Sequence, residues 1–155
     1  MPENAGQWLD NQFAGIREDL VEICEINSGS SNLQGLLRAA QWLRQQFPVD
    51  CEFSSIALPK RTNIDDLGKE NKHLAAPLLR WDCRPAARRR VLLAIHYDTV
   101  FGPEHGFQNC EQIDSDCLRG PGVADAKGGI LVIMKALEAY ERFAASDELG
   151  WTVVL

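Results

Sequence analysis

This sequence of 155 residues lacks several features that would place it in other classes of protein. No apolar run approaches the roughly 20 residues that cross a bilayer, and the N-terminal stretch has neither the basic leader nor the apolar core of a secretory signal. Sixteen basic side chains stand against twenty-two acidic ones, for a net charge of -6, whereas nucleic-acid binders normally carry a basic face. We therefore expect a soluble, cytoplasmic protein that binds neither nucleic acid nor membrane.

Paired cysteine motifs are also missing. The five cysteines are odd in number and spread along the chain, with no Cys-x-x-Cys pair, so a disulfide framework is not expected. Cys110 and Cys117 lie seven positions apart beside a glycine-rich loop, which leaves a metal or redox role open for them. The favoured interpretation is that the thiols are free and pack as small apolar side chains.

Helical periodicity is present in three segments, without internal repeats, and the length suits one domain with its own core. Apolar residues three and four positions apart predict helices over 5–26 and 33–47. The intervening NSGSS, residues 27–31, is a stop and restart signal for the helices. A third helix is marked by the apolar residues from Ile130 to Leu137.

Strand-like runs alternate with these helices. The stretch 51–58 predicts a strand, and the polar residues 59–75 predict an exposed excursion. The apolar runs 77–83 and 91–97 are expected to pair, and the second is nearly continuous, as in a strand covered on both faces. With the β-rich C-terminal stretch 151–155, the order of elements predicts an α/β fold: a layered sheet with helices on both faces.

The first candidate site is the end of the run VLLAIHYDTV, where His96 and Asp98 follow a buried strand. Alternating side chains place both on one face of a strand, at the carboxyl end where open α/β sheets bind ligands. The imidazole would suit a metal ligand whose tautomer is fixed by the carboxylate, or the pair would suit general acid–base work. A hydrogen-bonded core histidine beside a turn-capping aspartate is the structural alternative.

The second candidate is the glycine-rich stretch LRGPGVADAKGG, residues 118–129, with Asp125 at its centre. It fits neither phosphate-binding pattern, because G-x-G-x-x-G needs glycine at position 125 and the Walker pattern needs glycine directly before Lys127. We expect the loop to present a carboxylate, which can bridge two cations. A helix-capping aspartate is the structural alternative. A nucleotide-binding module remains an alternative function.

Two weaker features are interpreted as surface. His105 lies in a predicted loop, where an exposed histidine is more common than a ligand. The basic cluster of Arg84 and residues 88–90 is interpreted as a solvated turn, given the acidic chain as a whole.

Together, AIHYDTV and LRGPGVADAKGG resemble the co-catalytic zinc metallopeptidases, the family of aminoacylases, acetylornithine deacetylases and glutamate carboxypeptidases. The resemblance implies that His96 is a ligand of one zinc and that Asp125 bridges two. It implies a catalytic role for Asp98, which would orient the histidine. It also implies a cis peptide bond between Asp125 and Ala126, although Ala126 replaces the methionine or aspartate common at that position.

The resemblance further implies hydrolysis of an amide bond in a small peptide or N-acyl amino acid. A complete site would hold two zinc ions, with cobalt or manganese as substitutes, and a homodimer is allowed. In the family, adjacent glutamates and a late histidine complete the site after a strand like residues 151–155. We therefore expect 1–155 to be the truncated N-terminal part of the catalytic domain, without its dimerisation (lid) domain and inactive alone. A non-catalytic remnant that binds a partner is the other alternative.

Overall fold

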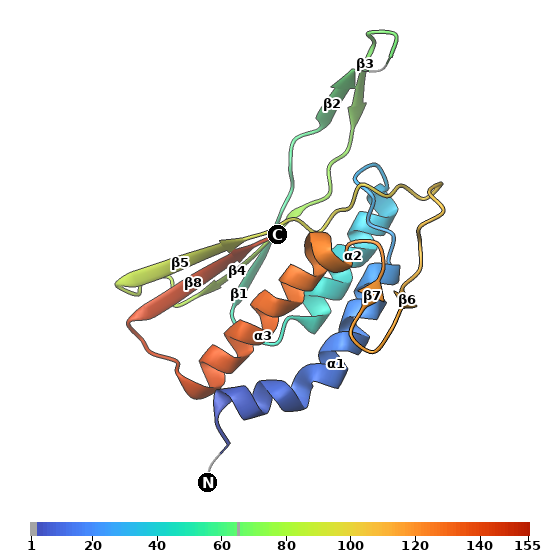
Figure 1. The fold of residues 1–155 in the computed structure, drawn as a ribbon. Coiled ribbons are helices and arrows are strands. Elements are labelled where there is room, and N and C mark those ends of the chain that lie inside the picture. Colours follow the sequence, from blue (N-terminus) through green and yellow to red (C-terminus); the bar gives the residue numbers. More distant parts are fainter. Residues whose placement is uncertain (1–2, 65) are drawn as a thin grey trace.

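The computed structural model describes residues 3–64 and 66–155 (Figure 1). Its elements are, in chain order, α1 (Ala5–Glu25), α2 (Leu33–Gln46), β1 (Glu52–Ile56), β2 (Arg61–Ile64), β3 (Glu70–His73), β4 (Leu78–Cys83), β5 (Arg89–Ala94), β6 (Glu111–Gln112), β7 (Leu118–Arg119), the irregular turn η1 (Val123–Lys127), α3 (Gly128–Phe143) and β8 (Leu149–Val154).

Side-chain caps start the first two helices. The Asn4 side chain accepts a hydrogen bond of 3.0 Å from the Gln7 N–H, while the Gln7 side chain accepts one from the Asn4 N–H. This reciprocal capping box satisfies two backbone donors at the start of α1. Asn32 accepts from the Gly35 N–H at 3.1 Å and starts α2 in the same way. The predicted helices over 5–26 and 33–47 are thus confirmed to within one residue at each end.

The main sheet has four strands in the order β1-β4-β8-β5. Strand β8 pairs antiparallel with β4 and parallel with β5. The prediction that runs 77–83 and 91–97 pair with each other is therefore wrong, because β8 lies between them. The parallel pair β5 and β8 needs a long crossover, which α3 supplies, and this crossover places the later strand inside the sheet.

All three helices lie against one face of this sheet (Figure 1). Alternate residues of β4 and β8 point to the helices and form the core with them; the buried members from these strands and from Leu155 are Leu79, Trp81, Trp151, Val153 and Leu155. The mixed α/β class with a layered sheet is confirmed, but among the described residues the expected second layer of helices is absent. Strand β5 is correspondingly exposed rather than covered on both faces, with Leu92 at 66% exposure.

The opposite face of the sheet is open and carries a polar network. Asp82 accepts hydrogen bonds from Thr152 Oγ1 at 2.6 Å and from Arg90 at 3.1 Å, and it also pairs with Arg80. At the end of the sheet, Arg84 forms a two-point ion pair with Glu141 of α3. The interpretation of the arginine cluster as a solvated turn is therefore wrong for Arg84 and Arg90, because both bind carboxylates of other elements.

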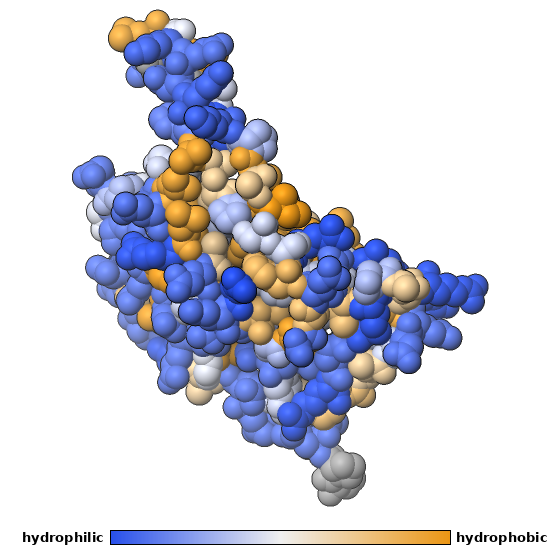
Figure 2. Space-filling model, turned by 180° about the vertical axis from the view of Figure 1, so that it is seen from behind, coloured by the Kyte–Doolittle hydropathy of each residue, from blue (hydrophilic) through white to orange (hydrophobic). Residues whose placement is uncertain are grey.

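The described side chains of the polar excursion over 59–75 are mostly exposed, as predicted, and the segment also forms a hairpin of β2 and β3. The hairpin projects from the body (Figure 1), and apolar surface gathers near its base on the far side (Figure 2). Among the described residues, no helix is long and apolar enough to cross a membrane. All five cysteines are free thiols, and Cys24 is fully buried.

Candidate functional site

The predicted site residues lie where the chain leaves the carboxyl end of β5. The strand ends at Ala94, and the segment 95–99 then runs beside residues 27–31. The Thr99 N–H donates to the Ser28 carbonyl at 2.9 Å, and the buried Ser28 hydroxyl donates to the Tyr97 carbonyl at 2.9 Å. The stretch NSGSS is thus more than a break between helices, because it fixes the path of the segment that carries His96.

The His96 ring is held by Asp98 on one side. Its Nδ1 lies 3.0 Å from the Asp98 backbone carbonyl and 3.1 Å from the Asp98 carboxylate. Both partners only accept, so Nδ1 carries the proton. The other nitrogen, Nε2, lies 3.0 Å from Oδ1 of Asp125. The expected contact of His96 with Asp98 is confirmed, although it forms beyond the strand and not within it.

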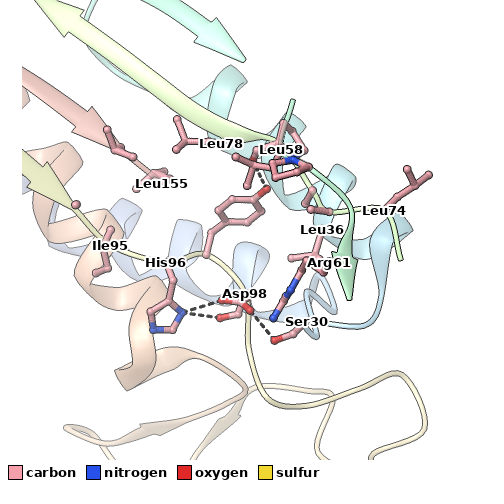
Figure 3. Close-up of a pocket in the computed structure, with 17 residues that line it drawn as sticks. Ser30, Leu36, Leu58, Arg61, Leu74, Leu78, Ile95, His96, Asp98 and Leu155 are labelled. Atoms are coloured by element: carbon pink, nitrogen blue, oxygen red, sulfur yellow. Dashed lines mark hydrogen bonds and ion pairs between the residues drawn. The ribbon is translucent and has the colours of Figure 1, made fainter. Parts of the chain in front are cut away.

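Ser30 restrains the Asp98 carboxylate by a hydrogen bond. The sequence had not indicated this role. The Ser30 hydroxyl donates to Asp98 Oδ2 at 2.5 Å, so Ser30, Asp98 and His96 form one chain of hydrogen bonds (Figure 3). The Ser30 N–H also donates to the Thr99 carbonyl at 2.9 Å. Three serines in NSGSS were visible in the sequence, but nothing local indicated which of them would meet a residue 68 positions later.

Asp125 projects from η1, with its side chain 86% exposed. Its backbone is extended rather than helical (φ -135°, ψ 95°), and the Asp125–Ala126 peptide bond is cis, as the resemblance implies. Gly122, which precedes the turn, has φ 85°, a conformation that favours glycine. At Gly128 a Cβ would come within 2.3 Å of the Val123 carbonyl oxygen, so both glycines are required by the turn itself.

The surroundings of His96 raise its pKa. Partial burial of the ring lowers the pKa, but the hydrogen bond to the Asp98 backbone, the hydrogen bond to Asp125 and the charges of both carboxylates outweigh that effect. A neutral imidazole with its proton on Nδ1 would direct the Nε2 lone pair at the Asp125 carboxylate. A positive charge between the two groups, either a proton on Nε2 or a cation, makes this contact attractive.

The separation of the two donor atoms suits a shared cation. Two ligands each about 2.0–2.1 Å from zinc, at a near-tetrahedral angle, lie about 3.3 Å apart, close to the observed 3.0 Å. Imidazole nitrogen and carboxylate oxygen are both common zinc ligands. Within the described residues, however, no three His, Cys, Asp or Glu side chains form a group that could hold one metal ion. The described residues thus bring two candidate ligands together and not three.

Two cavities meet at the His96–Asp98 pair. One of about 290 Å³ contains His96, Asp98 and Asp125, with Phe101 and Phe107 among its walls. The other, of about 770 Å³, is largely apolar, is also lined by His96 and Asp98, and extends to the base of the hairpin (Figure 3). Asp125 lines only the smaller cavity, so a ligand that contacts both His96 Nε2 and Asp125 would lie there.

The other candidates lie outside this group. His105 packs against the Phe101 ring, with centroids 5.0 Å apart, and accepts a hydrogen bond from the Phe107 N–H. Cys110 packs against the hydrophobic core, whereas Cys117 is exposed. The structure therefore brings together His96, Asp98 and Asp125 and leaves His105 and the two cysteines as loop or packing residues.

Residues 92–153 match the family model described as peptidase family M20/M25/M40. This segment includes His96, Asp98 and Asp125, and the match confirms the resemblance predicted from the two motifs. No curated protein matches the sequence significantly.

Solved structures of metallopeptidases share the fold. The chain is similar to the dipeptidase Dug1p of Saccharomyces cerevisiae (TM-score 0.75, 15% identity, 97% of this chain and 33% of that one). It is similar to human carnosine dipeptidase 1 (TM-score 0.76, 17% identity, 97% and 33%). It is also similar to the M20 metallo-carboxypeptidase Sso-CP2 of Sulfolobus solfataricus (TM-score 0.60, 16% identity, 90% and 30%). The chain thus spans about a third of the length of these proteins, and its fold matches the N-terminal part of their catalytic domains.

Proposed function

Because the chain resembles peptidase family M20/M25/M40 and shares the fold of its catalytic domains, we propose that it is the N-terminal part of a metal-dependent hydrolase of amide bonds. The observation that supports this most is the approach of His96 Nε2 and Asp125 Oδ1 to 3.0 Å, beside a cavity. These two groups come from separate motifs, 29 positions apart.

In this proposal, His96 and Asp125 are zinc ligands and Asp98 is the catalytic residue that orients His96. The Nδ1–H bond to Asp98 keeps the lone pair on Nε2, the nitrogen that faces Asp125. Ser30 in turn restrains the Asp98 carboxylate. When bound, zinc would supply Lewis acidity for amide hydrolysis. The exposed Asp125 carboxylate has an oxygen to spare for a second ion, so a complete site would hold two, with cobalt or manganese as substitutes.

The proposal extends to substrate and setting. The carnosine dipeptidase and Dug1p act on dipeptides by their names, which supports a small peptide as substrate; an N-acyl amino acid fits the same chemistry. We also propose that the protein is cytoplasmic and that it forms a homodimer. The alternative of nucleotide binding has no support from the geometry, because Asp125 places a negative charge at the centre of the glycine-rich turn.

The 155-residue chain alone should bind zinc weakly and hydrolyse nothing. A catalytic zinc usually has three protein ligands, whereas His96 and Asp125 provide two. Asp98 holds the His96 ring, and the backbone of η1 places the Asp125 carboxylate beside it, so weak binding should still depend on these two residues.

Titration calorimetry with zinc tests the metal site. We expect binding to the wild-type chain and its loss in His96→Ala and in Asp125→Ala. His73→Ala is the matched control, since it removes an exposed histidine of the hairpin and should leave binding unchanged. Equal binding by all four proteins would contradict the proposed ligands. An amidase assay with added zinc tests the other half of the proposal: turnover that disappears in His96→Ala would show that the chain is active alone.

A further inference from the structure

The side chain of Lys127 lies inside the protein, two residues after Asp125, with 1% of its surface exposed. Its Nζ donates hydrogen bonds of 2.9 Å to the backbone carbonyls of Ile23 and Ile26, at the C-terminal end of α1. Within the described part of the chain it forms no ion pair. Lysines are rarely buried without a charged partner, so here the negative end of the α1 dipole offsets the charge.

Lys127 also holds the turn η1 from within. Its backbone N–H donates to the Gly122 carbonyl at 2.8 Å, which closes the turn on itself. The stem of its side chain passes so close to Gly122 that a Cβ there would lie 3.0 Å from Lys127 Cδ. One residue therefore closes the turn and attaches it to helix α1, which is distant in sequence.

Asp125 depends on that attachment because its carboxylate has little else to fix it. Among the described interactions, the Asp125 side chain contacts His96 Nε2 and is otherwise exposed to solvent. The position of the carboxylate is therefore set by the backbone of η1. We infer that Lys127 is a positioning residue for Asp125: its hydrogen bonds to α1 hold the turn where Asp125 Oδ1 can share a cation with His96 Nε2. The binding of a cation rests on the proposed function, whereas the contacts of Lys127 with α1 do not.

A purely structural role gives a different expectation. If Lys127 only caps α1, its loss lowers the melting temperature and leaves the His96–Asp125 pair in place. If it positions Asp125, its loss opens that pair, beyond any change in stability. The two roles are separated by comparing Lys127→Met with a variant that is destabilised elsewhere.

The experiment uses Lys127→Met, which keeps an apolar stem of similar length and removes the donors. Leu43→Ala is the matched control, because Leu43 is fully buried in α2 and contributes nothing to the site. Both variants and the wild-type chain are crystallised without metal, and each is titrated with cobalt(II) while the visible absorption bands are recorded. His96→Ala is titrated alongside them.

We expect Lys127→Met to lengthen the Nε2–Oδ1 separation beyond hydrogen-bond reach, to lower cobalt affinity about 10–100-fold, and to alter the bands. Leu43→Ala should lower the melting temperature and keep both the separation and the affinity. An unchanged separation in Lys127→Met overturns the inference. If the wild-type chain binds no cobalt, or binds it no better than His96→Ala, the proposed metal site fails, and the crystallographic separation still decides the role of Lys127. If Lys127→Met does not fold, Lys127→Gln is crystallised in its place and must show the same lengthening.

Discussion

The two faces of the four-stranded sheet are built from the same strands and have opposite surroundings. On one face Trp81 and Trp151 lie under three helices, each with 3% exposure or less. On the other face Asp82, Arg90 and Thr152 form a hydrogen-bonded network, and Leu92 beside them is exposed. Alternation along a strand makes such a division natural, since neighbouring residues point to opposite faces.

This difference shows that an apolar run does not by itself predict that both faces of a strand are covered. The run 91–97 has few polar residues before His96, which is typical of strands covered on both faces. In the structure one face of β5 is open, so the pattern indicates suitability for burial and not the presence of a cover. Substitutions on the two faces should therefore change the free energy of unfolding by different amounts.

The largest effect is expected on the covered face. Trp151→Ala removes a side chain with 2% exposure that packs near the Phe47 ring, with centroids 6.2 Å apart. Replacing a buried tryptophan by alanine costs about 3–5 kcal/mol, because packing is lost and a cavity remains. Equilibrium unfolding in guanidinium chloride measures the loss. A loss below about 1 kcal/mol would mean that the helices do not pack on this face as described.

A smaller effect is expected where α3 is fastened to the edge of the covered face. Glu141 accepts two hydrogen bonds from Arg84 and one of 2.8 Å from Trp151 Nε1. Glu141→Gln removes the charge and leaves the Arg84 guanidinium without its carboxylate partner, at a cost of about 1–3 kcal/mol. Urea unfolding at neutral pH gives the value, and Glu138→Gln, on the same helix and paired with Lys135, is the control for a less connected ion pair. Equal losses would show that the contacts of Glu141 add nothing.

On the open face, Asp82 should make the free energy of unfolding depend on pH. Burial raises the pKa of Asp82, but hydrogen bonds from Thr152 and Arg80 and the charges of Arg80 and Arg90 outweigh it, so the pKa is lowered. A lowered carboxyl pKa adds stability above the unfolded value of about 3.9 and loses it as pH falls through the folded value. Asp82→Asn should therefore cost stability at pH 7, and the deficit should shrink as the pH falls below about 4. Unfolding curves from pH 7 to 3 measure it, and a deficit independent of pH would contradict the ionic role.

Much of the fold could be predicted from local patterns. Apolar periodicity predicted both N-terminal helices to within one residue at each end. The strand order could not be predicted, because β8 reaches its place between β4 and β5 through a crossover, and no local signal encodes that position. The ion pair of Arg84 could not be predicted either, because its partner Glu141 lies 57 positions away in the sequence.

The candidate site shows the same limit. His96 and Asp98 are two positions apart, so both could be identified from one short motif, although their contact forms in the segment after β5 and not within the strand. Asp125 was identified from the composition of its loop. Ser30 and Lys127 were not identified, because their functional contacts join segments that are distant in sequence. Polar residues that support a site from another element are invisible to periodicity, whereas the residues that form the site stand in compact motifs.

The smallest effect is expected at the exposed position of β5. Leu92→Ser changes a side chain with 66% exposure that neighbours Arg90 and Thr152 on the open face. Exposed substitutions away from caps and networks usually change stability by less than about 0.5 kcal/mol, and the strand should tolerate serine because its backbone pairing with β8 is unchanged.

Unfolding curves of Leu92→Ser and the wild-type chain at two protein concentrations, tenfold apart, measure this loss of stability. A loss above about 1 kcal/mol at both concentrations would show that Leu92 is buried within the chain, and a loss seen only at the higher concentration would show that a second copy covers the face. A negligible loss at both would show that Leu92 contributes little by apolar burial, in contrast to Trp151 on the face beneath the helices.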